Sequence, residues 1–177
     1  HTEERLCVRD ALRGLRENID RNHSRGHLRR RDERAGANDA RHSRRTEKLY
    51  QAGMELPHTE LAQRVQSLID DETLGAVRQV WCKEFRGPWA LKVDQWITQK
   101  EKSGGALVEK NCHHFDLFNR IIGRTPVRVT GFGTCDLVYG PERFEGVTPD
   151  VLDNAQVLVS YENGATAALM LCMYCSG

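Results

Sequence analysis

Residues 154–174, NAQVLVSYENGATAALMLCMY, decide what kind of sheet this chain can form. Two apolar runs, 154–162 and 165–174, are joined by the dipeptide Asn163-Gly164. Asn-Gly between two strand-like runs is a strong short-range signal for a β-hairpin, because both residues tolerate the backbone angles of a tight turn. We therefore predict two antiparallel strands here.

A helix is predicted within residues 58–75, HTELAQRVQSLIDDETLG. Thr59 is a plausible N-cap and Gly75 closes the turn that follows. The spacing of the apolar residues is helical, because it places four of them on one face: Leu61, Val65, Leu68 and Ile69.

Further elements connect this helix to the hairpin. Residues 76–85 alternate as a half-buried strand does, and residues 86–105, with two Trp, a Pro and a Gly pair, read as a long ordered loop. A helix over 115–123 and a strand beginning at Pro126 follow. The order predicts an α+β fold with a largely antiparallel sheet. Because the sequence ends at Gly177 directly after a strand, we expect the sheet to be incomplete.

The chain has 177 residues and a formal net charge of +1, which hides an asymmetry. Residues 1–48 carry 14 basic and 9 acidic side chains, 13 of the basic ones being Arg, and contain no aromatic residue. Such a segment has too few apolar residues to offset the entropy lost on ordering, so we expect it to be disordered or loosely helical. A basic arm for nucleic acid is one interpretation, but no aromatic is present to stack on a base. We favour instead a segment that is not native coding sequence, and predict no nucleic-acid partner.

Six cysteines are spread through the chain without the dense spacing of a secreted disulfide scaffold. They are interpreted as reduced thiols, which predicts a cytoplasmic protein. Cys172 and Cys175 form a C-x-x-C, but in a strand-like run their side chains would face opposite ways. No apolar run reaches the length of a spanning helix, so no membrane partner is predicted.

The stretch GGALVEKNCHHFDL, residues 104–117, concentrates polar residues in an apolar run. A metal site is disfavoured, because adjacent histidines on a helix point about 100° apart and no second Cys/His pair has zinc spacing. Glu109 and His113 are four residues apart, so on a continuous helix they would share a face. A carboxylate beside an imidazole makes the ring a usable acid or base near neutral pH. The alternative is a solvated helix start with a capping acid.

From about residue 49 to 177 the chain resembles the Gfo/Idh/MocA family of NAD(P)-dependent oxidoreductases, which includes inositol dehydrogenases. Four segments carry the resemblance: 51–55, 70–80, 92–117 and 153–173. Matched position by position, Glu109 falls on the family's active-site acid, His113 on its catalytic-site histidine and Asp116 on the acid that follows. His114 falls on a variable position and receives no catalytic role.

The resemblance implies hydride transfer between NAD or NADP and a hydroxyl-bearing carbon of a sugar or polyol. Lys92, Trp96 and Lys110 are candidates for substrate contact, while Glu109 is expected to orient His113. The alternative is a non-catalytic binding or assembly module derived from such an enzyme.

The resemblance also implies an N-terminal dinucleotide-binding domain, of which residues 49–74 would be the tail. Residues 75–177 would form a truncated substrate-binding and dimerisation domain, with an open sheet and helices on one face. No G-x-G-x-x-G occurs in the sequence, so residues that could bind the cofactor are unknown and the chain alone is expected to bind no dinucleotide and to be inactive.

A homo-oligomer through the open sheet face is the expected assembly. Along the predicted strand 156–161, Val157, Val159 and Tyr161 alternate with Gln156, Leu158 and Ser160. We expect the exposed face of this strand to be apolar and to need cover, and an exposed apolar sheet face is a typical partner surface.

Overall fold

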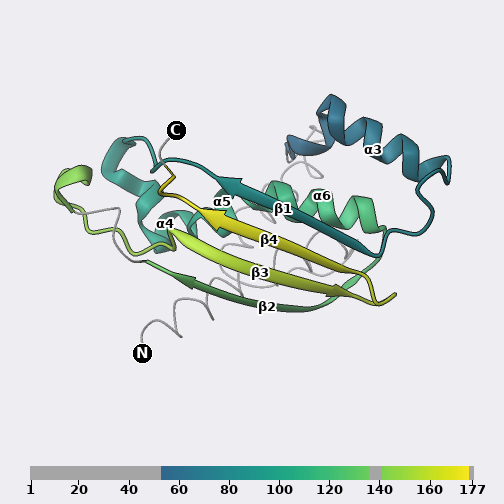
Figure 1. Ribbon diagram of the computed structural model, residues 1–177. Coiled ribbons are helices and arrows are strands. Elements are labelled where there is room, and N and C mark those ends of the chain that lie inside the picture. Colours follow the sequence, from purple (N-terminus) through teal and green to yellow (C-terminus); the bar gives the residue numbers. More distant parts are fainter. Residues whose placement is uncertain (1–52, 136–140, 176–177) are drawn as a thin grey trace, which may run out of the picture.

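The structure, a computed structural model, describes residues 53–135 and 141–175 (Figure 1). The predictions for residues 1–48 therefore lie outside the described residues. The described part contains a helix α3 (Glu60–Asp70), a strand β1 (Gln79–Phe85), a loop region with short helices, a helix α6 (Cys112–Ile122) and the strands β2 (Pro126–Thr134), β3 (Asn154–Tyr161) and β4 (Thr166–Cys172). This order of helices and strands is the predicted one.

The four described strands form one sheet in the order β1-β4-β3-β2. β2 and β4 each pair with β3 in antiparallel fashion, and β1 pairs with β4 in parallel. A parallel pair needs a crossover between its strands, and here the crossover includes α6, β2 and β3. The predicted α+β fold with a largely antiparallel open sheet is confirmed.

The predicted hairpin of β3 and β4 is confirmed. Its connection runs over residues 162–165, where Gly164 has a φ of 78°. The N–H of Tyr161 donates to the carbonyl of Ala165 at 2.9 Å and closes the hairpin. Gly is suited to this position because a residue with a Cβ is strained at positive φ.

The ends of both long helices follow local signals in the sequence. The Thr59 hydroxyl accepts a hydrogen bond from the N–H of Ala62, so the predicted N-cap of α3 is confirmed. Gly123, the last residue of the predicted helix, ends α6 in the left-handed conformation. The expected apolar face of α3 is wrong at Leu61, which is 77% exposed. The buried residue of this helix is its neighbour Ala62, which points in a different direction.

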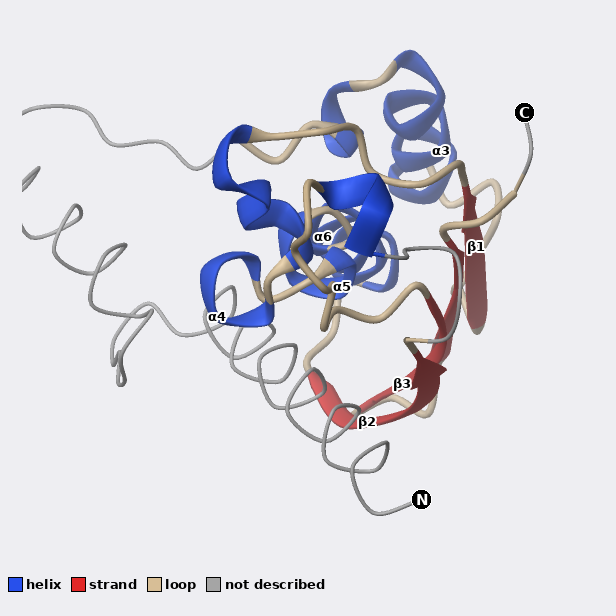
Figure 2. Cartoon of the chain, turned by 90° about the vertical axis from the view of Figure 1, so that its left-hand side faces the viewer, coloured by secondary structure: helices blue, strands red, loops and turns tan. Residues whose placement is uncertain are grey.

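The helices and the core lie on one face of the sheet, and the other face is open (Figure 2). Side chains from α6, from the loop region and from the covered face of the strands pack together in a single cluster. Phe118 of α6 and Leu169 of β4 are almost fully buried in it. The hydroxyl of Tyr161 donates to the side-chain oxygen of Asn119 at 2.9 Å and so ties β3 to α6.

The prediction that Val157, Val159 and Tyr161 form a surface in need of a partner is wrong. These residues are 1%, 1% and 3% exposed, because they face the helices of their own chain. The open face of β3 carries Gln156, Leu158 and Ser160 instead. This open face is still rich in large apolar side chains, which come mostly from other strands: Trp81, Phe85, Phe132, Leu158 and Met170.

The prediction that Cys172 and Cys175 point in opposite directions is also wrong. β4 ends at Cys172 and the chain bends at Met173, so the alternation of a strand does not continue to Cys175. The two sulfur atoms lie 3.2 Å apart.

Candidate functional site

The polar stretch 104–117 folds as two short helices with a break between them. α5 (Ala106–Glu109) ends one turn after the glycine pair, and α6 begins at Cys112. Gly105 has a φ of 78°, and an added Cβ there would meet the side chain of Val151 at 3.3 Å. The sequence therefore needs this glycine, both for its backbone angle and for the close contact with the segment before β3.

His113 lies in the first turn of α6, where its side chain is 18% exposed. Its Nδ1 accepts a hydrogen bond from the backbone N–H of Glu55 at 3.4 Å, and its Nε2 lies 3.8 Å from the Glu55 carboxylate. Because Nδ1 is the acceptor, the neutral ring carries its proton on Nε2. Glu55 thus holds both sides of the imidazole.

The Glu55 carboxylate also binds Lys110, whose Nζ lies 2.5 Å from the same oxygen. The hydrogen bond and positive charge of Lys110 hold the pKa of Glu55 below its ordinary value, although burial acts in the opposite direction. The carboxylate is therefore ionised near neutral pH, and its charge is shared between an ammonium group and the imidazole.

His114, the next residue, has different surroundings. It is buried, its Nδ1 lies 3.4 Å from the side-chain amide of Asn111, and its Nε2 lies 3.5 Å from Glu84 on β1. Burial lowers the pKa of His114, while the charge of Glu84 acts in the opposite direction. His114 is therefore a packed histidine.

Glu109 does not contact His113 in this fold. Helix α5 ends at Glu109, so the i,i+4 relation assumed from the sequence does not exist, and within residues 53–135 and 141–175 no hydrogen bond or ion pair joins the two side chains. Instead, Cys112 donates to the carbonyl of Glu109 at 3.6 Å. Burial raises the pKa of the Cys112 thiol, and the charge of Glu109 adds to the rise. The expected contact between Glu109 and His113 is therefore absent, and a role of Glu109 in orienting the imidazole stays a prediction.

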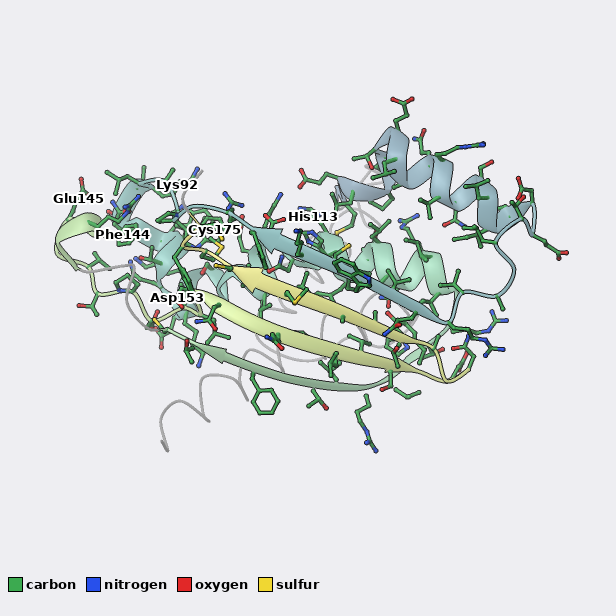
Figure 3. The ribbon with its side chains drawn as sticks, viewed as in Figure 1. Lys92, His113, Phe144, Glu145, Asp153 and Cys175 are labelled. Atoms are coloured by element: carbon green, nitrogen blue, oxygen red, sulfur yellow. The ribbon has the colours of Figure 1, made fainter. Side chains whose placement is uncertain are left out.

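The remaining candidates are divided between two places. Lys110 and His113 both lie close to the carboxylate of Glu55. Lys92, in contrast, lies at the far end of the molecule, at the same end as Phe144 and Glu145 (Figure 3). Lys92 and Trp96 belong to a 3-10 helix, η2 (Val93–Thr98), and its N-cap. η2 is tied to that end by the side chain of Gln95, which donates to Glu145 at 2.9 Å. The structure does not bring the Lys92 side chain to His113. Asp116, the third residue of the motif, pairs with Arg120 at 2.8 Å within α6.

A groove of about 460 Å³ lies between α3 and α6. Leu117, one helical turn after His113, lines it on the α6 side, and Pro57, two residues after Glu55, lines its other end. Most of its other lining residues are polar: Gln63, Gln66, Ser67, Asp70 and Arg120. The groove therefore has an open, mostly polar wall, and His113 is not one of its lining residues.

Neither a metal cluster nor a membrane span is found in the described chain. Among residues 53–135 and 141–175 no three His, Cys, Asp or Glu side chains are placed to hold a metal ion. In the same residues every helix is too short or too polar to cross a bilayer.

Reasoning from the sequence missed the part played by Glu55 and Glu84. Glu55 is 58 residues from His113, and Glu84 lies on a strand that no local pattern connects to α6. The presence of Glu55 in one of the four segments that carry the family resemblance was the only available signal.

Comparison with known proteins agrees with this architecture. A relative in Bacillus subtilis (strain 168), named "Putative oxidoreductase YteT", is 31% identical over 83 residues, which cover 45% of this chain and 19% of that protein. The WlbA dehydrogenase from Bordetella pertussis, solved with NADH and UDP-GlcNAcA, matches with a TM-score of 0.64 and 14% identity over 79% of this chain and 41% of its own. The aldose-aldose oxidoreductase from Caulobacter crescentus, solved with glycerol, matches with a TM-score of 0.59 and 20% identity over 75% and 38%.

The chain therefore spans less than half the length of these relatives. At these identities the two solved structures show a shared fold. The sequence model of the GFO/IDH/MocA C-terminal domain matches residues 62–177, which is more than half of the chain. The chain thus belongs to the GFO/IDH/MocA family of oxidoreductases, through its C-terminal domain.

Proposed function

We propose that this chain is the substrate side of an enzyme that moves a hydride between NAD or NADP and a hydroxyl-bearing carbon of a sugar or polyol. The observation that carries the proposal is His113, an imidazole held on both sides by Glu55 yet partly exposed at the start of α6. Such a group can exchange a proton with a bound hydroxyl, which is what a general acid or base must do.

The proton chemistry follows from the contacts of His113. When a hydroxyl-bearing carbon is oxidised, its O–H proton has to leave, and a neutral imidazole can accept it. In this tautomer the lone pair is on Nδ1, so the substrate hydroxyl would have to replace the N–H of Glu55 at that nitrogen. The imidazolium that forms lies 3.8 Å from the Glu55 carboxylate, which stabilises its positive charge. Lys110 keeps that carboxylate ionised, so Glu55 and Lys110 are positioning residues and His113 is the proposed catalytic residue.

The residues of this chain do not fit a dinucleotide. Binding a pyrophosphate needs a Gly-rich turn whose N–H groups converge at a helix N-terminus, and no G-x-G-x-x-G occurs in the sequence. The dinucleotide would take the hydride and would be held elsewhere in the whole enzyme. The residues described here deal only with the hydroxyl proton.

The substrate class is inferred from relatives and from the groove. One similar structure was solved with glycerol and another with UDP-GlcNAcA. The groove between α3 and α6 is lined by Leu117, one helical turn after His113, and offers amide, hydroxyl, carboxylate and guanidinium groups, which suit a ligand with several hydroxyls. Roles for Lys92 and Trp96 in substrate contact stay predictions.

Converting His113 to Ala tests the catalytic proposal in a complete enzyme that includes a dinucleotide-binding domain. We expect the rate of hydride transfer to fall by roughly 100-fold or more, because a general acid–base contributes at least that factor. His58→Ala, an exposed histidine in the neighbouring helix η1 (Leu56–His58), is the matched control and should leave the rate unchanged. An unchanged rate in His113→Ala would remove this residue from the mechanism.

Glu55→Gln and Glu109→Gln separate the two carboxylates. We expect Glu55→Gln to lower the rate and to change its pH dependence, since the imidazolium loses its negative partner. Glu109→Gln should change the pH dependence less, because Glu109 does not touch His113. The reverse order would return the orienting role to Glu109.

A second proposal concerns assembly, and it holds for an enzyme and for a non-catalytic module alike. The open sheet face exposes Phe132, Trp81, Leu158 and Phe85 by 78%, 61%, 57% and 51%, and an apolar surface of this kind marks a partner site. We infer that a second copy of the chain covers it.

The assembly proposal is tested by light scattering after size-exclusion chromatography. Leu158→Asp should convert a dimer to a monomer, because it places a charge in the proposed apolar interface. Leu61→Asp is the matched control, since Leu61 is equally large and exposed but lies on α3, off the sheet. A monomeric parent chain, or a dimer that survives Leu158→Asp, would contradict the proposal.

A further inference from the structure

Two cysteines lie at a bend after β4, and three backbone hydrogen bonds hold the chain in this bend. Cys172 ends the strand and its carbonyl accepts from the N–H of Arg86 at 2.9 Å. The N–H of Cys175 donates back to the carbonyl of the same Arg86 at 3.1 Å. Between them, the N–H of Met173 donates to the carbonyl of Asp153 at 2.7 Å, and Met173 is fully buried. Contacts with Arg86 and Asp153, which are distant in sequence, therefore fix the conformation of the bend.

This bend brings Cys175 Sγ to 3.2 Å from Cys172 Sγ, with both residues half-buried and both thiols free. A disulfide has an S–S length of about 2.0 Å, so roughly 1 Å of movement would join them. Cys175 lies at the end of the sheet near Asp153 and away from His113 (Figure 3). The pair is therefore outside the proposed catalytic site.

We propose that Cys172 and Cys175 form a reversible dithiol–disulfide site that exchanges with small-molecule disulfides of the glutathione type. The thiolate of one cysteine attacks a sulfur of oxidised glutathione, forms a mixed disulfide and releases one glutathione thiolate. The second cysteine then attacks the protein sulfur of that mixed disulfide and displaces the other glutathione. In total the protein loses two electrons and two protons, and one oxidised glutathione becomes two reduced molecules.

The cross-link would act on the neighbouring edge of the sheet. Arg86 directly follows β1, bonds to both cysteines through its backbone, and places its guanidinium 4.8 Å from the ring centre of Trp89. A disulfide between Cys172 and Cys175 would restrain the bend that holds this segment. Amide hydrogen exchange at Arg86 and Cys175 should therefore slow when the site is oxidised.

The pH dependence of the exchange follows from the same contact. The hydrogen bond with Cys172 raises the pKa of the Cys175 thiol. Since only the thiolate attacks, exchange that begins at Cys175 should accelerate as the pH rises.

The test is incubation of the 177-residue chain with oxidised glutathione, alkylation of the remaining thiols and tryptic mass spectrometry. Trypsin releases residues 144–177 as one peptide, because no Lys or Arg follows Arg143, and this peptide contains Cys172 and Cys175 as its only cysteines. We expect this peptide to lose two hydrogens and to resist alkylation, and dithiothreitol should reverse the change.

Single variants keep the result interpretable. Cys172→Ser and Cys175→Ser should each accumulate a stable mixed disulfide with one glutathione, because the resolving thiol is gone. Cys135→Ser, which removes an exposed cysteine outside this peptide, should behave like the parent chain. Stable glutathione adducts on both cysteines of the parent chain, or alkylation of both, would overturn the proposal.

A second measurement needs no oxidant. Phenylarsine oxide bonds to two neighbouring thiolates at once, so the parent chain should bind it at the 144–177 peptide and each single variant should lose at least tenfold in affinity. Equal binding by Cys175→Ser and the parent chain would also overturn the proposal.

Discussion

Two adjacent histidines show how much one step along a helix changes a side chain's surroundings. His113 and His114 point about 100° apart around α6. The first therefore meets Glu55 at the surface, whereas the second turns inward to Asn111 and Glu84. Their different surroundings follow from this direction, since the two side chains are chemically the same.

The burial of His114 makes stability depend on pH. Because burial lowers its pKa in the folded chain, the unfolded chain takes up a proton first as the pH falls. The stability that comes from burying the neutral ring is fully present above the pKa of the unfolded chain, about 6.5. It is lost as the pH falls from there through the lower pKa of the folded chain. We expect the free energy of unfolding, measured with urea at several pH values, to fall on acidification.

His114→Gln should flatten that pH dependence over the same window, although it can lower stability at every pH. His58→Gln, at an exposed histidine, should keep the dependence of the parent chain. An equally steep loss of stability in His114→Gln would show that other groups carry the effect.

At the scale of elements, the faces of β3 and β4 decide which residues hold the fold together. Leu169 on β4 faces the helices and is 1% exposed, whereas Leu158 on β3 faces outward and is 57% exposed. Replacing each of these leucines with alanine removes the same atoms, so any difference in the loss of stability reflects the difference in burial.

Leu169→Ala should lower the free energy of unfolding by about 2–5 kcal/mol, because it leaves a cavity in a packed core. Leu158→Ala should cost less than about 1 kcal/mol in the monomer, since its side chain is mostly in water. Urea denaturation at low protein concentration measures both. Similar losses at the two positions would mean that the open face is covered under the conditions used.

At the scale of the whole molecule, the chain contains the proposed proton-handling groups without a recognisable site for a pyrophosphate. We expect calorimetry with NADH and with NADPH at physiological salt to show no saturable binding to the 177-residue chain. The Arg-rich residues 1–48 could attract phosphate through charge, but such an interaction weakens as salt rises. A stoichiometric site of micromolar affinity would show that these residues form a cofactor domain.

The sequence by itself determined the local parts of the fold. The Asn-Gly hairpin, the Thr59 cap of α3 and the glycine end of α6 are each specified by residues within a few positions of one another. The order of the elements predicted the α+β fold class, and the family resemblance, which rests on sequence segments, singled out His113.

Only the tertiary structure decided which groups meet. The parallel pairing of β1 with β4, the two faces of β3 and the contact of Glu55 with His113 all join residues distant in the chain. The break between α5 and α6 cancelled the expected Glu109–His113 pair, and the bend after β4 brought Cys172 to Cys175. A period of 3.6 or 2 residues predicts contacts only while the helix or strand continues. Where an element ends, packing against the rest of the chain sets the direction of each side chain.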